Sequence, residues 1–196
     1  MTTLIFATNN QHKVYEIQTL LPSDIQVITL QQAGIDIDIP EPYNTLQENA
    51  NTKAKTIFEL TNQNCFSEDT GLEIDALHGA PGVHSARYAG EHKNFNDNIE
   101  KVLSNLKNIK NRKSRFRTVI CLIWNKKEYY FEGICEGKIA EQNSGNEGFG
   151  YDPIFIPTGA DKSFAAMTMN EKNTFSHRQK AVTQLFTFLQ SHDKEN

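Results

Sequence analysis

The sequence predicts an α/β protein in which helices flank a β-sheet, and three patterns support this. The apolar run Leu4–Ala7 leads directly into an amphipathic helical pattern. The run Val119–Trp124 is continuously apolar, as in a central strand buried on both faces. Helical patterns with good N-capping residues separate the remaining strand-like runs. A chain of 196 residues suffices for a single domain over residues 1–196 with a sizeable core, and leaves room for two lobes.

Composition limits the classes of partner. The net charge is −4, and Lys and Arg form only a loose cluster over residues 107–117, so nucleic acid is not expected as a partner. No run of 18 apolar residues occurs, so no membrane partner is expected. The N-terminus begins directly with a strand, which leaves no room for a signal peptide. Cys65, Cys121 and Cys135 lie in apolar runs without metal-ligand spacing, which predicts buried thiols in a reducing cytoplasm.

The first predicted helix begins where an anion could bind. Asn10 is a suitable N-cap, and the apolar face of the helix consists of Val14, Ile17, Leu20 and Leu21. A helix N-terminus offers backbone N–H groups and a positive dipole end, and Lys13 can reach the same anion. The segment is not a P-loop, because it lacks the Gly-x-x-x-x-Gly-Lys pattern. The alternative is an ordinary capped helix.

The next segments predict two strands and a helix. Residues 25–30 read as a strand, and residues 35–39 alternate strictly between Ile and Asp, as a half-buried strand does. Thr45 and Glu48 form a capping-box pattern. The helix after it has a small and apolar face, and Asn49 and Lys53 lie four residues apart on an adjoining polar stripe.

Two adjacent acids, Glu68 and Asp69, follow the short strand-like run Cys65–Phe66 and precede Gly71. Neighbouring carboxylates repel each other and hydrate strongly, so packing alone does not favour them at the end of a strand. A divalent cation such as Mg²⁺ would explain them, because it takes one or two carboxylates together with water and substrate phosphates. It would also offset the repulsion between an acidic protein and a phosphate ligand. The alternative is a solvated turn.

The C-terminal half predicts a helix, a hairpin and a last helix. Asn94 can cap a helix that extends to about residue 106. A turn at residues 125–127 would join the strand at 119–124 to a long partner strand at 129–140. Ser176 and Gln179 form a capping-box pattern at the start of the final helix.

Two further features suggest a ligand. The loop at residues 145–153 combines glycines with Phe149, Tyr151 and Asp152, so its backbone could approach a flat ligand and an aromatic ring could stack on it. A tight turn before a strand is the alternative. His177 and Arg178 stand in the first turn of the last helix, at the unfavourable end of its dipole, which suggests a compensating anion or carbonyl group. The alternative is two exposed basic residues.

Together these segments resemble the inosine triphosphate pyrophosphatase family, which hydrolyses non-canonical purine nucleoside triphosphates. The resemblance covers essentially the whole chain in order. Its motifs are Thr8-Asn9-Asn10 with Lys13, Pro40-Glu41, Glu48-Asn49-Ala50 with Lys53-Ala54, Glu68-Asp69-Thr70-Gly71-Leu72, Gly79-Ala80-Pro81-Gly82 with Ser85-Ala86-Arg87-Tyr88, Phe149-Gly150-Tyr151-Asp152-Pro153, and Glu171-Lys172-Asn173 with Ser176-His177-Arg178.

The resemblance implies a fold, a cofactor and a set of roles. The fold is a long, twisted mixed sheet with flanking helices that forms two lobes around a nucleotide cleft, usually in a homodimer. Mg²⁺ is bound by Glu41 and Asp69, and Asp69, with Glu68 beside it, forms the catalytic pair in which Asp69 is the general base. The triphosphate is held by Thr8, Asn9, Asn10, Gln11, His12 and Lys13. Phosphate or its neighbouring groups are contacted by Lys53, Thr70 and Lys172. The base is surrounded by Phe149, Gly150, Tyr151, Asp152, His177 and Arg178.

The sequence departs from the family pattern at Ala166, where relatives commonly have an acid, so a salt bridge near Lys172 is in doubt. Glu68 stands where many bacterial relatives have aspartate. Two other functions remain open: a pyrophosphatase for modified pyrimidine nucleotides, and a nucleotide-binding sensor that has lost catalysis. The presence of Glu41, Glu68 and Asp69 argues against a sensor, which needs neither metal ligands nor a base.

Overall fold

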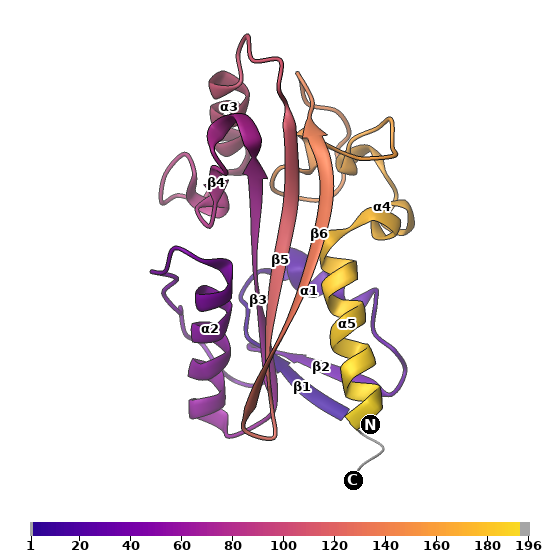
Figure 1. The fold of residues 1–196 in the computed structure, drawn as a ribbon. Helices are drawn as coiled ribbons and strands as arrows, with labels where there is room; N and C mark the ends of the chain where they lie inside the picture. The colour runs from indigo at the N-terminus through magenta and orange to yellow at the C-terminus, as the bar shows by residue number, and fades with distance from the viewer. Residues whose placement is uncertain (1, 193–196) are drawn as a thin grey trace. The chain divides into compact units, whose positions relative to one another are not determined.

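A computed structural model describes residues 2–192 of the chain. Its strands are β1 (Thr2–Phe6), β2 (Ile25–Thr29), β3 (Cys65–Ile74), β4 (Pro81–Gly82), β5 (Lys113–Trp124), β6 (Lys127–Ile139) and β7 (Phe155–Pro157). Its α-helices are α1 (Gln11–Gln18), α2 (Leu46–Thr61), α3 (Phe95–Asn105), α4 (Met169–Phe175) and α5 (His177–His192), as labelled in Figure 1. No helix among residues 2–192 is long and apolar enough to cross a membrane.

The described strands form one mixed sheet in the order β2-β1-β3-β5-β6-β7, and β4 pairs with β3. β1 runs parallel to both β2 and β3, whereas the pairs β3–β4 and β6–β7 are antiparallel. The predicted α/β class with a mixed sheet and flanking helices is therefore confirmed. The chain divides into two compact units, and β3, β5 and β6 contribute residues to both.

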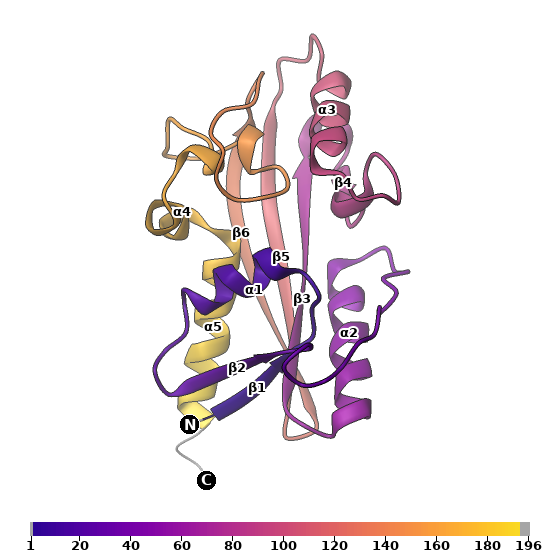
Figure 2. The same cartoon turned by 180° about the vertical axis from the view of Figure 1, so that it is seen from behind.

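Unit 1 comprises residues 2–69, 118–133 and 178–192 of the described chain. Side chains of its strands point alternately into two hydrophobic cores. Leu4, Phe6 and Leu122 enter a core with α1 and α5, whereas Ile5 and Cys121 enter a core with α2. In this unit α2 and α5 lie on opposite sides of the strands (Figures 1 and 2). Burial on both faces explains why Leu4–Ala7 and Val119–Trp124 are continuously apolar.

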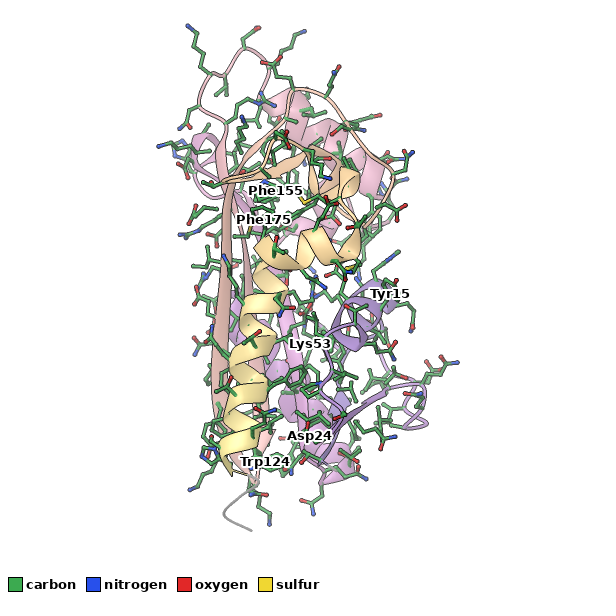
Figure 3. The ribbon with its side chains drawn as sticks, turned by 90° about the vertical axis from the view of Figure 1, so that its right-hand side faces the viewer. Tyr15, Asp24, Lys53, Trp124, Phe155 and Phe175 are labelled. Carbon is green, nitrogen blue, oxygen red and sulfur yellow. The ribbon has the colours of Figure 1, made fainter. Side chains whose placement is uncertain are left out.

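An aromatic side chain at the end of β5, Trp124, belongs to the core that unit 1 forms with α1 and α5. Trp124 packs with Phe186 and Leu189 of α5, and Figure 3 shows it beside the last turns of this helix. The two-residue turn Asn125-Lys126 then leads into β6, and both residues have positive φ, 50° and 64°. Such a turn matches the twist of a hairpin. The predicted hairpin is therefore confirmed.

Unit 2 comprises residues 70–117 and 134–177. One hydrophobic core holds it together, with Leu72 and Ile74 of β3, Ile99 and Val102 of α3, and Phe116 of β5 among its members. Phe155 at the start of β7 contacts the ring of Phe116 edge-on, with ring centroids 4.7 Å apart. Figure 2 shows α3 and β4 as neighbours within this unit.

Residues 35–39 and α4 are among the segments that differ from the sequence prediction. Residues 35–39 form no strand: their Ile side chains are half-buried against the α2 core, but no neighbouring strand supplies a ladder of hydrogen bonds. The alternating pattern therefore predicted correctly that the Ile side chains are partly buried, but it predicted wrongly that their backbone pairs with another strand. The helix α4 was not predicted, although Thr168 and Glu171 form a reciprocal capping box at its start.

Candidate active site

The acid pair lies inside β3, not at its end, so the strand-end prediction is wrong. Glu68 and Asp69 are 1% and 7% exposed, which also rules out the solvated turn. Adjacent side chains of a strand point to opposite faces. Glu68 accordingly contacts residues of α1 and α5, and Asp69 contacts residues of α2. The two carboxylates have different partners and therefore different tasks.

Asp69 faces the polar stripe of α2. Asn49 donates a hydrogen bond from Nδ2 to Asp69 over 3.3 Å. The ammonium of Lys53, labelled in Figure 3, lies 3.7 Å from Asp69 Oδ1 and also forms an ion pair with Glu41. Asn49 and Lys53 are 1% and 8% exposed, so this stripe faces β3 and not the solvent. Lys53 thus joins the two carboxylates that the sequence predicts as metal ligands.

Burial and charge shift the protonation equilibria of this group. Burial raises the pKa of Asp69 above its ordinary value, and Glu41 adds to the rise while Lys53 opposes it. Burial alone would lower the pKa of Lys53, but the charges of Asp69 and Glu41 outweigh it and raise this pKa. A buried carboxylate with a raised pKa is a better proton acceptor than an ordinary aspartate, as a general base requires.

Glu68 is held by cations on the other face of β3. Arg178 donates from Nε to both carboxylate oxygens over 3.0 and 2.9 Å, and from Nη2 to Oε1 over 2.8 Å. Lys13 Nζ lies 3.2 Å from the same Oε1. Burial alone would raise the pKa of Glu68, but Arg178 and Lys13 lower it to about 2. A carboxylate so fully paired is a poor proton acceptor, which favours Asp69 over Glu68 as the general base.

The guanidinium of Arg178 contacts a second carboxylate. Its Nη1 donates to Glu16, which lies one turn after Lys13 on α1. Glu16 and Arg178 are 4% and 2% exposed. The sequence predicts an anion or carbonyl group that compensates the basic residues at the start of α5. For Arg178, the carboxylates of Glu16 and Glu68 are these anions. Neither His177 nor Arg178 is an exposed basic residue, so that alternative is wrong.

The structure confirms the predicted cap at the start of α1. It leaves fewer backbone N–H groups for an anion than the sequence suggested. Asn10 Oδ1 accepts hydrogen bonds from the backbone N–H groups of His12 and Lys13 over 3.0 and 3.2 Å. Two donors that the sequence assigned to an anion are therefore already bound by the cap. Thr8 Oγ1 accepts from the Asn10 N–H, and Asn9 Nδ2 donates to the Ile37 carbonyl. Gln11 follows as the first, exposed residue of the helix.

In unit 2 the glycine-rich loop is folded around Asp152. Its Oδ2 accepts from the Phe149 N–H over 2.9 Å and from Lys172 Nζ over 2.6 Å. Gly148 has φ +75°, and a Cβ there would come 2.1 Å from this same oxygen, so only glycine fits. The salt bridge left in doubt by Ala166 is present, with Asp152 as the partner of Lys172.

The aromatic side chains around this loop have different environments. Tyr151 is 4% exposed and donates from its hydroxyl to the Ser85 carbonyl, so its ring belongs to the core of unit 2. Phe149 is half-buried, next to Phe95, and Lys172 lies over its ring. His177 stacks on Phe116 with ring centroids 4.7 Å apart. Thr70 is half-buried on β3, and Gly150 has φ +61°.

The predicted metal ligands fit a divalent cation through the chemistry of their donors. Glu41 and Asp69 already share one cation, the ammonium of Lys53. Among residues 2–192 no group of three or more His, Cys, Asp or Glu side chains could hold a metal. A site with two carboxylates suits Mg²⁺, which completes its coordination with water and phosphate oxygens.

Sequence reasoning missed two polar residues of this site as participants. Asn49 was placed on a polar stripe and in a family motif but was given no role, and Glu16 was not singled out. Each lies one helical turn from a lysine that was predicted, four residues before Lys53 and three after Lys13. That spacing is the signal that could have identified both.

Comparison with known proteins places the chain in a family. A family model described as the Ham1 family matches residues 4–188, and the chain belongs to this family. It is 49% identical to a protein of Flavobacterium johnsoniae, in a match that covers 95% of this chain and 97% of the relative. It is 50% identical to a protein of Porphyromonas gingivalis, in a match that covers 96% of this chain and 98% of that relative. Both relatives are named dITP/XTP pyrophosphatase. The Ham1 protein of Staphylococcus aureus has a similar structure, with a TM-score of 0.88, 37% identity, and coverage of 97% of this chain and 100% of that one. The predicted family is confirmed.

Proposed function

We propose that the chain hydrolyses non-canonical purine nucleoside triphosphates, namely ITP, dITP and XTP, to the nucleoside monophosphate and pyrophosphate. It would thereby cleanse the nucleotide pool. One structural observation carries the proposal: the buried carboxylate of Asp69 lies 3.7 Å from the ammonium of Lys53, which also pairs with Glu41, on one face of β3. The names of relatives that match nearly the full length of the chain support the same reaction.

In this reaction a water molecule attacks the α-phosphorus. The new bond joins the water oxygen to the α-phosphorus, the bond from that phosphorus to the bridging oxygen of the β-phosphate breaks, and pyrophosphate leaves. Asp69 accepts the proton of the attacking water, and Asn49 orients its carboxylate through the hydrogen bond of 3.3 Å. Lys53 moves its charge from the carboxylates to the phosphates as these become more negative.

Glu41 and Asp69 would hold Mg²⁺, which supplies positive charge to the phosphate oxygens. Thr8, Asn9, Asn10, Gln11, His12 and Lys13 would bind the triphosphate, the amide of Gln11 and the ammonium of Lys13 being its donors. Thr70 and Lys172 would contact phosphate or its neighbours. In this proposal Glu68 does not touch the reacting atoms.

The loop of unit 2 would select the base. A 6-oxo purine presents an acceptor at C6, whereas adenine presents an amino donor. The Phe149 N–H is already bound to Asp152, so we assign the donor role to the amides of Gly150 and Tyr151, with Phe149 covering the ring and His177 beside it. An amino group facing these donors would leave buried donors unpaired, which can discriminate by about 10⁴-fold. Guanine shares the 6-oxo group, so its exclusion would act through its 2-amino group.

The test is a panel of triphosphates with Mg²⁺, scored for pyrophosphate against orthophosphate. We expect kcat/KM for ITP, dITP and XTP to exceed that for ATP and GTP by orders of magnitude, with pyrophosphate as the product. Equal kcat/KM for ITP and ATP would overturn the proposed substrate class. Rapid hydrolysis of modified pyrimidine triphosphates would favour the pyrimidine alternative, and tight binding without turnover would favour the sensor.

We further propose a cytoplasmic homodimer. Buried cysteines that form no disulfide among the described residues and the nucleotide substrate support the compartment, and the resemblance to the family supports the dimer. Sedimentation equilibrium tests the dimer directly.

A further inference from the structure

We propose that Glu16 is a positioning residue: through Arg178 and Glu68 it holds Lys13 and the first turn of α1 in place for phosphate binding. The inference rests on the proposed function, because it assigns a task to a residue that would not touch the substrate. It starts from an unusual feature of unit 1. Four charged side chains, Lys13, Glu16, Glu68 and Arg178, alternate in sign in one connected, largely buried network.

The first step concerns the cost of burial. Glu16 is 4% exposed, and burying a carboxylate is expensive unless a cation compensates it. Its neighbours on α1 need no acid for packing, since Val14 and Ile17 already supply the apolar face. Replacing a buried ion pair by apolar side chains is often neutral or stabilising, so stability alone is a weak reason for this arrangement.

The second step concerns geometry. Lys13 and Glu16 lie three residues apart, on one side of α1. Lys13 pairs with the carboxylate of Glu68, and Glu16 pairs with the guanidinium of Arg178. α1 is therefore attached by two charged contacts on successive turns. Together with the packing of Val14 and Ile17 in the core, these two contacts restrict the rotation of α1 and the direction of its N-terminus.

The third step concerns Lys13. Glu68 binds Lys13 only through Oε1, an oxygen that Arg178 also contacts. By holding Arg178 through Nη1, Glu16 fixes the guanidinium that orients the Glu68 carboxylate. A change at Glu16 should therefore reach the ammonium of Lys13 through two side chains, without any contact between Glu16 and the phosphates.

The experiment uses the full-length protein, with inorganic pyrophosphate as the probe of the phosphate site. Glu16→Gln keeps the size and removes the charge; Glu16→Asp keeps the charge and shortens the side chain. Glu73→Gln is the matched control, because Glu73 in unit 2 also accepts from an arginine, Arg115, over 2.6 Å. Pyrophosphate affinity is measured by calorimetry with Mg²⁺, KM and kcat are measured with ITP and ATP, and far-UV circular dichroism checks the fold.

We expect Glu16→Gln to weaken pyrophosphate binding about tenfold, as for loss of a charge-assisted contact, and to raise KM for ITP and ATP by the same factor. Glu16→Asp should fall between this variant and the wild type, and Glu73→Gln should match the wild type. In a double-mutant cycle, Glu16→Gln should add little to Lys13→Ala, because both act on the same ammonium.

Unchanged pyrophosphate affinity in a folded Glu16→Gln variant, or additive effects of Glu16→Gln and Lys13→Ala, would overturn the inference and leave Glu16 with a structural role only. If Glu16→Gln does not fold, the same measurements on Glu16→Asp decide. A loss of turnover for ITP but not for ATP in Glu16→Gln would also contradict the inference. That result would show that the four charged residues act on recognition of the base and not on phosphate binding. Wild-type protein that neither binds pyrophosphate nor hydrolyses ITP would instead refute the proposed function.

Discussion

The ammonium of Lys53 lies 3.7 Å from the carboxylate of Asp69, and both side chains are about nine-tenths buried. The pair joins α2 to β3 within unit 1. Glu41 pairs with the same ammonium, so Lys53 joins two carboxylates, and the proposed function has this ammonium turn to the phosphates of the substrate. The first three predictions below test it.

Asp69→Asn should keep the fold and reduce kcat for ITP by roughly 10²- to 10⁴-fold, because an amide cannot accept the proton of the attacking water. The change preserves size and the contact with Asn49. Steady-state kinetics, with the thermal midpoint as a check on folding, measure it. Near-wild-type turnover would remove Asp69 from the role of general base.

Removal of divalent metal should abolish hydrolysis, and added Mg²⁺ should restore it. Two carboxylates beside a highly charged triphosphate repel it at short range, and the single charge of Lys53 offsets only part of this repulsion. EDTA treatment followed by titration with Mg²⁺ and Ca²⁺ measures the dependence. Full activity after exhaustive chelation would contradict the assignment of Glu41 and Asp69 as metal ligands.

Lys53→Met should destabilise the metal-free protein by about 1–3 kcal/mol, because it leaves the buried Asp69 without its cation. Lys13→Met should cost less, because Glu68 keeps its contacts with Arg178. Urea denaturation in EDTA compares the two variants. A larger loss for Lys13→Met than for Lys53→Met would contradict this order.

Cys65 and Cys121 should resist alkylation in the folded protein at pH 8. Burial raises the pKa of the Cys65 thiol to about 12 and that of Cys121 to about 11, so little thiolate forms at this pH. Mass spectrometry after iodoacetamide treatment should find both unmodified under native conditions and modified in urea. Rapid native labelling of either thiol would contradict their burial.

Most of the long strands and helices could be predicted from the sequence, because their signals are local. The cap at Asn10, the apolar run to Trp124 and the turn at Asn125 each depend on neighbours within a few residues. The prediction was wrong at residues 35–39, where alternation recorded one buried side but could not show that a pairing strand is missing.

The tertiary structure alone decided which charges meet. The sequence shows two adjacent acids, but only the direction of β3 assigns Asp69 to Lys53 and Glu68 to Arg178, the latter 110 residues away in the chain. The pairing of Lys172 with Asp152 and the burial of Glu16 follow from similar long-range packing. Residue types set which chemistry is possible at each position, whereas the partners and pKa values of buried charges depend on the distances and dielectric environment that packing creates.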